Sequence, residues 1–150
     1  MNPCDSRKRI WYLSGGMTRF GSENFDESNN WRVEISRRIE DLSNGSVICF
    51  NPNSHWNLTT DPNEFTDREA MNLDIYKLRN SELVIYSNND PLSRGSMIEL
   101  GIAWERRIPI ISFDEWENEI HPWLKSMSER IFNNRIQMLE YLNDHYIIIN

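Results

Sequence analysis

The chain has 150 residues, with 23 acidic against 16 basic side chains and a formal net charge of −7. That length suits one domain with a hydrophobic core, so we expect a single domain over residues 1–150. The acidic balance excludes a nucleic-acid polymer as the main partner, since such binding needs clustered positive charge to meet the phosphates.

Other features of the composition point to a soluble cytoplasmic protein without a metal. No apolar run approaches the length of a membrane span, and the first residues lack the apolar core of a signal peptide. The two cysteines, Cys4 and Cys49, have no zinc-binding spacing. Cys49 lies in an apolar run, and we expect it to be a buried strand residue.

The first half of the chain alternates short apolar runs with polar or amphipathic stretches. Apolar residues recur every three or four positions after Trp31, which indicates a helix. Gly15 and Gly16 end the first apolar run. We expect strands at residues 9–14 and 46–50, a helix at 31–42, and loops at 17–30 and 51–66.

The second half continues the alternation. We expect helices at 67–79, 93–104 and, whole or broken, 123–143, with strands at 83–86, 108–113 and 146–149. From Met97 onward the middle helix is apolar nearly all round, which indicates that it is buried. Strands alternating with helices predict a parallel sheet covered on both faces.

Two carboxylates lie at positions that the apolar pattern predicts to be buried. Asp74 lies on the apolar stripe of its helix, and Glu99 lies among apolar neighbours in the first turn expected for the next helix. A buried carboxylate is costly unless it is compensated. For Glu99 we expect the positive end of the helix dipole to compensate it. The alternative is a capping or salt-bridged glutamate without a chemical role.

Both acids belong to helices that flank the strand at 83–86, so we expect them at one crevice along the carboxyl edge of the sheet. Paired carboxylates suit reactions at a sugar anomeric carbon, where one attacks and the other manages a proton. The loop with Ser14, Gly15, Gly16 and Arg19 meets the same edge and is a candidate cradle for a hydroxyl or phosphate. A plain turn is the alternative. His55 is a candidate ligand contact in the loop at 51–66.

Residues 67–113 resemble the nucleoside 2-deoxyribosyltransferase superfamily, which includes the deoxynucleoside 5′-monophosphate N-glycosidases. The family pattern is a helical Asp, a strand with a polar turn, then G-[ST]-x-x-E-[LI]-G-x-A. Asp74 fits the helical Asp, and Tyr12 fits a family Tyr that touches the catalytic Glu. The remaining matches are Gly95, Ser96, Glu99, Leu100, Gly101 and Ala103.

The resemblance implies a flavodoxin-like α/β three-layer sandwich with a five-stranded parallel sheet. It implies a covalent glycosyl intermediate on Glu99, with Asp74 acting on the base and its proton and Tyr12 orienting Glu99. It implies a nucleoside or nucleotide substrate, with a free base as a possible second substrate, and no cofactor. It also implies homo-oligomers, dimers or larger, in which a neighbour helps complete each site.

Ser93 departs from the deoxyribosyltransferase pattern, which often has Asp six residues before the catalytic Glu. The monophosphate glycosidases carry Ser there, close to the phosphate, so Ser93 with Arg94 or Arg19 favours a nucleotide. Their Arg-Gly-Gly loop, however, is not reproduced. Three interpretations stay open: deoxyribosyl transfer to another base, hydrolysis of a 5′-monophosphate, and a non-catalytic nucleotide sensor. The base, the ribose or deoxyribose preference and the oligomer size stay open as well.

Overall fold

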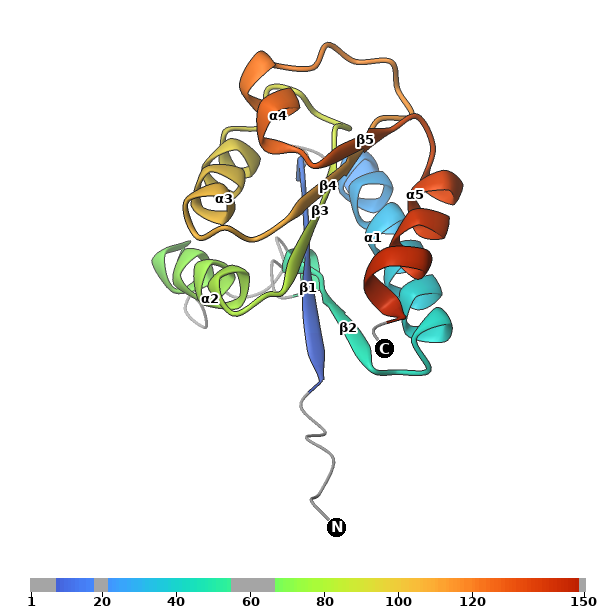
Figure 1. Ribbon diagram of the computed structural model, residues 1–150. Coiled ribbons are helices and arrows are strands. Elements are labelled where there is room, and N and C mark those ends of the chain that lie inside the picture. Colours follow the sequence, from blue (N-terminus) through green and yellow to red (C-terminus); the bar gives the residue numbers. More distant parts are fainter. Residues whose placement is uncertain (1–7, 18–21, 55–66, 149–150) are drawn as a thin grey trace.

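The computed structural model describes residues 8–17, 22–54 and 67–148. Its centre is a five-stranded sheet in the order β2-β1-β3-β4-β5, in which every neighbouring pair is parallel (Figure 1). The strands are β1 (Arg9–Gly15), β2 (Val47–Phe50), β3 (Leu83–Ser87), β4 (Ile110–Phe113) and β5 (Arg130–Phe132).

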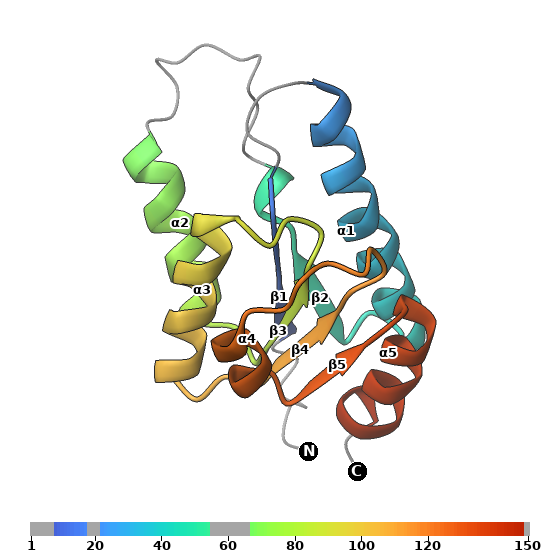
Figure 2. The same ribbon diagram turned by 90° about the horizontal axis from the view of Figure 1, so that it is seen from above.

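Helices cover both faces of this sheet, as Figure 2 shows from above. They are α1 (Ser22–Leu42), α2 (Asp67–Arg79), α3 (Arg94–Glu105), α4 (Pro122–Met127) and α5 (Arg135–Leu142). α1 and α5 lie on one face, and α2, α3 and α4 lie on the other. This is the predicted flavodoxin-like three-layer α/β sandwich. Within the described ranges, no helix has the length and apolar character needed to cross a membrane.

The alternation of side chains along β1 sorts its residues between the two layers. Trp11 and Leu13 belong to a buried cluster with residues of α1 and α5. Tyr12 belongs to the opposite cluster, with Leu78 of α2 and Leu100 of α3. The same alternation directs the next polar residue, Ser14, toward the α2–α3 layer.

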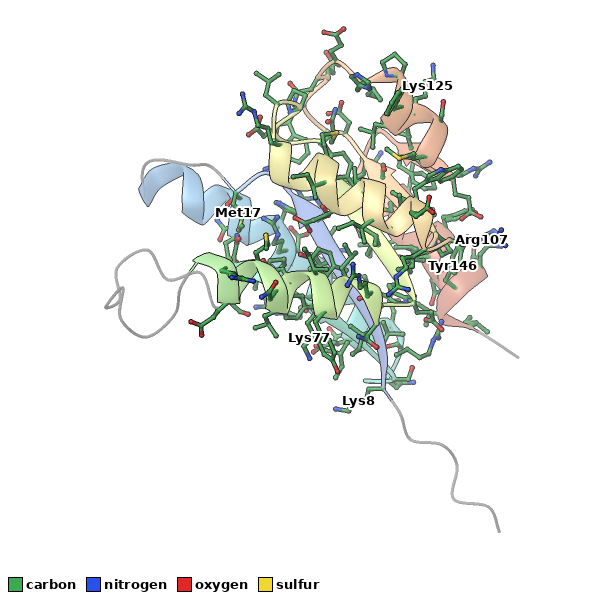
Figure 3. The ribbon with its side chains drawn as sticks, turned by 90° about the vertical axis from the view of Figure 1, so that its left-hand side faces the viewer. Lys8, Met17, Lys77, Arg107, Lys125 and Tyr146 are labelled. Carbon is green, nitrogen blue, oxygen red and sulfur yellow. The ribbon has the colours of Figure 1, made fainter. Side chains whose placement is uncertain are left out.

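The order of the strands reverses direction between β1 and β3. The chain passes from β1 to β2 on one side, and β3, β4 and β5 then build outward on the other. Open α/β sheets bind ligands at such a switch point, outside the carboxyl ends of the strands. Met17, just after β1, lies at the end of the molecule where α2 and α3 begin, whereas Arg107 lies at the opposite end (Figure 3).

The C-terminal third differs from the sequence prediction. The expected helix at 123–143 is interrupted by β5, and the expected last strand at 146–149 is a π-helical turn, Asn143–Ile147, over its described part. Ser128 ends α4 and Asn134 caps α5, so polar residues isolate a strand of only three residues. A run of three residues is too short to show a hydrophobic period, so it could not be distinguished from the helical pattern on either side.

Two helices also differ from their predicted extent or burial. α1 begins at Ser22, inside the loop expected at 17–30. The prediction missed this start because the first turns of the helix are polar and show no apolar stripe. α3 begins at Arg94, so Glu99 lies in its second turn rather than its first. α3 is not buried all round either, since Ile98 is 62% exposed and Trp104 is 57% exposed.

Candidate active site

The Glu99 side chain, on α3, lies close to Tyr12 and Ser14 of β1. Its Oε2 atom is buried and makes no hydrogen bond to any described residue. The Tyr12 Oη and Ser14 Oγ atoms are buried and unpaired in the same way. Buried polar groups without partners are rare in folded proteins and call for an explanation. Tyr12 and Ser14 both approach Glu99, so the three groups form one polar cluster.

Burial raises the pKa of Glu99 to about 7. The Tyr12 hydroxyl and the positive charge of Arg32 oppose that rise, Asp74 adds to it, and the Ser14 hydroxyl opposes it. The two hydroxyls approach the carboxylate closely enough to favour its charged form, although their geometry is looser than that of a full hydrogen bond. Glu99 is therefore poised to exist as either an acid or an anion near neutral pH.

Tyr12 remains a proton donor at this site. Burial, followed by the charges of Glu99 and Asp74, raises the pKa of its hydroxyl far above the ordinary value. The ring is fully buried and packs against Phe50, with ring centroids 5.5 Å apart. Because the ring is fixed, its hydroxyl stays beside Glu99, where it can orient the carboxylate.

Asp74 is a second carboxylate that acts electrostatically on Glu99 and Tyr12. It is 9% exposed and belongs to α2, which lies beside α3 on the same face of the sheet. The two acids singled out in the sequence, Asp74 on an apolar stripe and Glu99 among apolar neighbours, thus act on each other electrostatically.

Arg32 was missed by the sequence analysis, although it is 1% exposed and acts on Glu99, Tyr12 and Asp74. Over residues 28–42 of α1, the part whose burial is described, the buried positions are 28, 31, 32, 35 and 39, which follow a helical stripe that includes two polar residues. The expected stripe instead ended in Leu42, which is 44% exposed. The signal that revealed Asp74, a charged residue on an apolar stripe, also applies to Arg32.

The loop after β1 is fixed by the loop after β3. The Gly16 N–H donates to Asn89 Oδ1 at 3.0 Å, and Asn89 Nδ2 donates to the Gly16 carbonyl at 3.2 Å. The Gly16 N–H is thus occupied, which argues against its expected part in an anion cradle. A Cβ on Gly15 would lie 2.9 Å from Trp31 Cζ2, so the close approach requires glycine there.

Ser93 caps the start of α3. Its Oγ accepts from the Ser96 N–H at 3.3 Å and lies 2.9 Å from Ser96 Oγ. Ser96 is buried, whereas Gly95 is exposed and a Cβ there would meet nothing within 4 Å. The packing around residue 95 therefore does not require a glycine.

Two candidate residues cannot be placed, and the two other histidines and Cys49 lie in the contacts given below. Arg19 and His55 lie outside the described residues. His121 caps α4 by accepting from the Trp123 N–H at 3.1 Å. His145 lies against Tyr141, with ring centroids 4.6 Å apart. Cys49 is buried in β2, as predicted.

The sequence matches no family model and no curated protein, but the fold has close relatives. A 2-deoxyribosyltransferase from Bacillus psychrosaccharolyticus superposes with a TM-score of 0.63 at 14% identity, over 87% of this chain and 95% of that chain. A CMP N-glycosidase from Clostridium botulinum superposes with a TM-score of 0.58 at 21% identity, over 91% of this chain and 99% of that chain.

The chain has the 2-deoxyribosyltransferase fold. A conserved protein from Enterococcus faecalis V583 shares it, with a TM-score of 0.71 at 13% identity over 91% of this chain and 98% of that chain. The resemblance noted in residues 67–113 is thus confirmed at the level of the fold.

On this 2-deoxyribosyltransferase fold, α3 and α4 carry an apolar groove on their outer side. Three of its residues are large and exposed: Ile98, Trp104 and Trp123, the last at 74%. The other lining residues are Met97, Gly101, His121, Ser126 and Met127. Contiguous exposed apolar surface of this kind is typical of an interface between proteins.

Proposed function

We propose that the protein cleaves the N-glycosidic bond of a (deoxy)nucleoside or nucleotide and transfers the deoxyribosyl group to another base. The observation that carries the proposal is the electrostatic coupling of two acids, the buried Asp74 and Glu99, whose Oε2 atom is buried. A binding protein gains nothing from holding two carboxylates in one buried site, where their repulsion costs stability. The 2-deoxyribosyltransferase and CMP N-glycosidase neighbours support the same class of reaction.

In the proposed first step, a Glu99 carboxylate oxygen attacks the anomeric carbon C1′. The bond from C1′ to the base nitrogen breaks, and its electron pair stays on the base. In the form of the protein that reacts, the Asp74 carboxyl carries a proton, which it gives to that base, and the base leaves neutral. Tyr12 donates toward Glu99 and holds it in line for the attack, so the attacking oxygen is placed before the substrate arrives.

In the second step, a nitrogen of an incoming base attacks C1′ and displaces Glu99, while Asp74 takes the proton that this nitrogen loses. Both carboxyl groups return to their starting states. Water in place of the second base gives free sugar and makes the protein a hydrolase. The pKa of Glu99, about 7, leaves a substantial fraction of the carboxylate ionised at neutral pH, and the anion is the form that attacks.

A 5′-monophosphate substrate with water as acceptor is the second candidate. Ser93 favours it, because this hydroxyl caps α3 at the edge where Glu99 lies. A helix N-terminus favours a negative ligand, and a hydroxyl there can donate to a phosphate oxygen. An aspartate at the same position would repel phosphate instead. The roles proposed for Ser14, Ser96 and the Gly15–Gly16 loop are contacts to the sugar and its 5′ substituent, made through groups other than the Gly16 N–H, which Asn89 occupies.

Chromatography of a deoxynucleoside panel tests these candidates. Each compound, with and without a 5′-phosphate, is incubated with and without a free base. A swapped nucleoside supports transfer, whereas free base plus sugar supports hydrolysis. No change with any compound would refute the enzymatic proposal and favour the nucleotide sensor.

We also infer that the protein forms homo-oligomers through the α3–α4 groove. Its exposed tryptophans, Trp104 and Trp123, would bury a large apolar area against a second copy. α3 also carries Glu99, so a partner there would approach the site. Light scattering of the wild type and of Trp104→Glu tests this, with a dimer or larger expected for the wild type alone. A monomeric wild type would contradict it.

A further inference from the structure

Arg32 is a buried cation without a direct ion pair to any described carboxylate. Its guanidinium donates instead to three backbone carbonyls: Ser28 at 2.7 Å, Gly15 at 2.7 Å and Leu13 at 3.5 Å. It also stacks on the Trp31 ring, 4.7 Å from the centroid. A buried charge without a partner is strongly destabilising. A protein therefore keeps one only where something else offsets that cost.

The carbonyls that Arg32 holds flank one residue of the site. Leu13 and Gly15 lie on either side of Ser14, whose hydroxyl approaches Glu99. Arg32 therefore fixes the end of β1 from the α1 side, while Asn89 fixes the adjacent Gly16 from the β3 side. These two anchors determine where the Tyr12 and Ser14 hydroxyls can lie.

The groups that act on Glu99 come from three elements. β1 contributes the uncharged hydroxyls of Tyr12 and Ser14, and α2 contributes Asp74, whose negative charge repels that of Glu99. α1 contributes Arg32, the only cation that acts on Glu99 among the described residues. Since Glu99 lies in the second turn of α3 rather than at its first N–H groups, the helix N-terminus does not supply the compensation.

We propose that Arg32 is a positioning residue that favours the anionic form of Glu99 and holds the Ser14 end of β1 in place. As a role in catalysis this rests on the function proposed above, whereas the electrostatic effect on Glu99 does not. The effect is mutual, because Glu99 and Asp74 in turn offset the burial of the guanidinium. Burial lowers the pKa of Arg32 to about 10, so the guanidinium remains charged at neutral pH.

Two substitutions separate the charge of Arg32 from its hydrogen bonds. Arg32→Gln keeps an amide donor for the β1 carbonyls and removes the charge. Arg32→Lys keeps the charge and loses the forked geometry. Arg135→Met is the control, since Arg135 pairs with Glu34 and Glu115 and is not among the groups that act on Glu99.

The pKa of Glu99 is measured by NMR titration of carboxyl-labelled glutamate, with the signal assigned by its loss in Glu99→Gln. Arg32→Gln should raise the pKa of Glu99 above about 7, by about 1 to 3, because an opposite charge nearby shifts a carboxyl by that amount. Arg32→Lys and Arg135→Met should leave it close to the wild-type value. In turnover, the acid limb of the pH profile of kcat/KM should move upward in Arg32→Gln alone.

An unchanged Glu99 pKa in Arg32→Gln would overturn the proposal. So would a rise in Arg32→Lys, and this outcome decides the matter even if Arg32→Gln does not fold. The titration uses the full chain without substrate. A protein that turns over no nucleoside but shows the expected shift would refute the proposed function and leave the electrostatic role of Arg32 standing.

Discussion

Replacing Glu99 with glutamine should stabilise the protein in alkaline solution and leave its stability in acid little changed. Glutamine keeps the shape of the side chain and removes the charge. The wild-type carboxyl has its pKa raised from 4.5 to about 7, mainly by burial. A difference of one in pKa corresponds to about 1.4 kcal/mol, so the ionised form costs the folded state about 3 kcal/mol.

The direction of the pH dependence follows from proton linkage. Below pH 4.5 the carboxyl is protonated in both the folded and the unfolded chain, so its burial adds no ionisation cost. Between pH 4.5 and about 7 the folded chain keeps a proton that the unfolded chain has lost, and stability falls as the pH rises. Above about pH 7 the full cost is present.

Urea unfolding at about pH 5 and about pH 8.5 measures this difference. The free energy of unfolding of Glu99→Gln relative to wild type should grow by about 2 to 3 kcal/mol between the two conditions. Glu105→Gln is the control, because Glu105 is exposed at the end of the same helix and should show little change. An equal difference at both pH values would refute the reasoning and mean that Glu99 is compensated in the folded state.

Four further substitutions test the site and the packing around it. Asp74→Asn should lower kcat by about 10²- to 10⁴-fold with little change in KM, since asparagine cannot transfer a proton; an unchanged rate would leave Asp74 a structural residue. Ser93→Asp should lower kcat/KM for a 5′-monophosphate far more than for the matching nucleoside, because a like charge near the phosphate costs about 1 to 4 kcal/mol; an equal change for both would favour nucleoside transfer. Gly15→Ala should destabilise the fold in urea by about 1 to 3 kcal/mol through contact with Trp31, while Gly95→Ala, at an open helical position, should stabilise it by about 0.5 to 1 kcal/mol. Equal effects of the two alanines would contradict the packing described at Gly15.

Much of the central half of the fold could be predicted from periodicity. The bounds of α2 agree with the expected helix, because its stripe of apolar residues is regular and polar residues end it. The two carboxylates were recognisable for the same reason, as exceptions on regular stripes. Their coupling to Tyr12 depends on strand order and alternation, and the resemblance supplied it before the structure did.

The rest could not be predicted for physical reasons that differ from place to place. Arg32 lies on a stripe with Ile35 and Ile39 that also includes the polar Ser28, and this second polar residue weakened the signal that a charged residue on an apolar stripe gives. β5 is a strand because it pairs with β4 through Ile111 and its neighbours. This pairing is a tertiary contact, and a run of three residues is too short to predict it from sequence. The compensation of Glu99 depends on where α3 begins, and a difference of a few residues at a helix start moves the charge away from the free N–H groups.

Mass spectrometry of the protein quenched during turnover tests the central claim most directly. With a deoxynucleoside substrate, the account predicts a protein species heavier by one deoxyribosyl group, with the modification in the peptide that contains Glu99. Glu99→Ala should fold, show no modification and turn over no substrate. Turnover that continues in Glu99→Ala, or a deoxyribosyl group found on a different residue, would contradict the account.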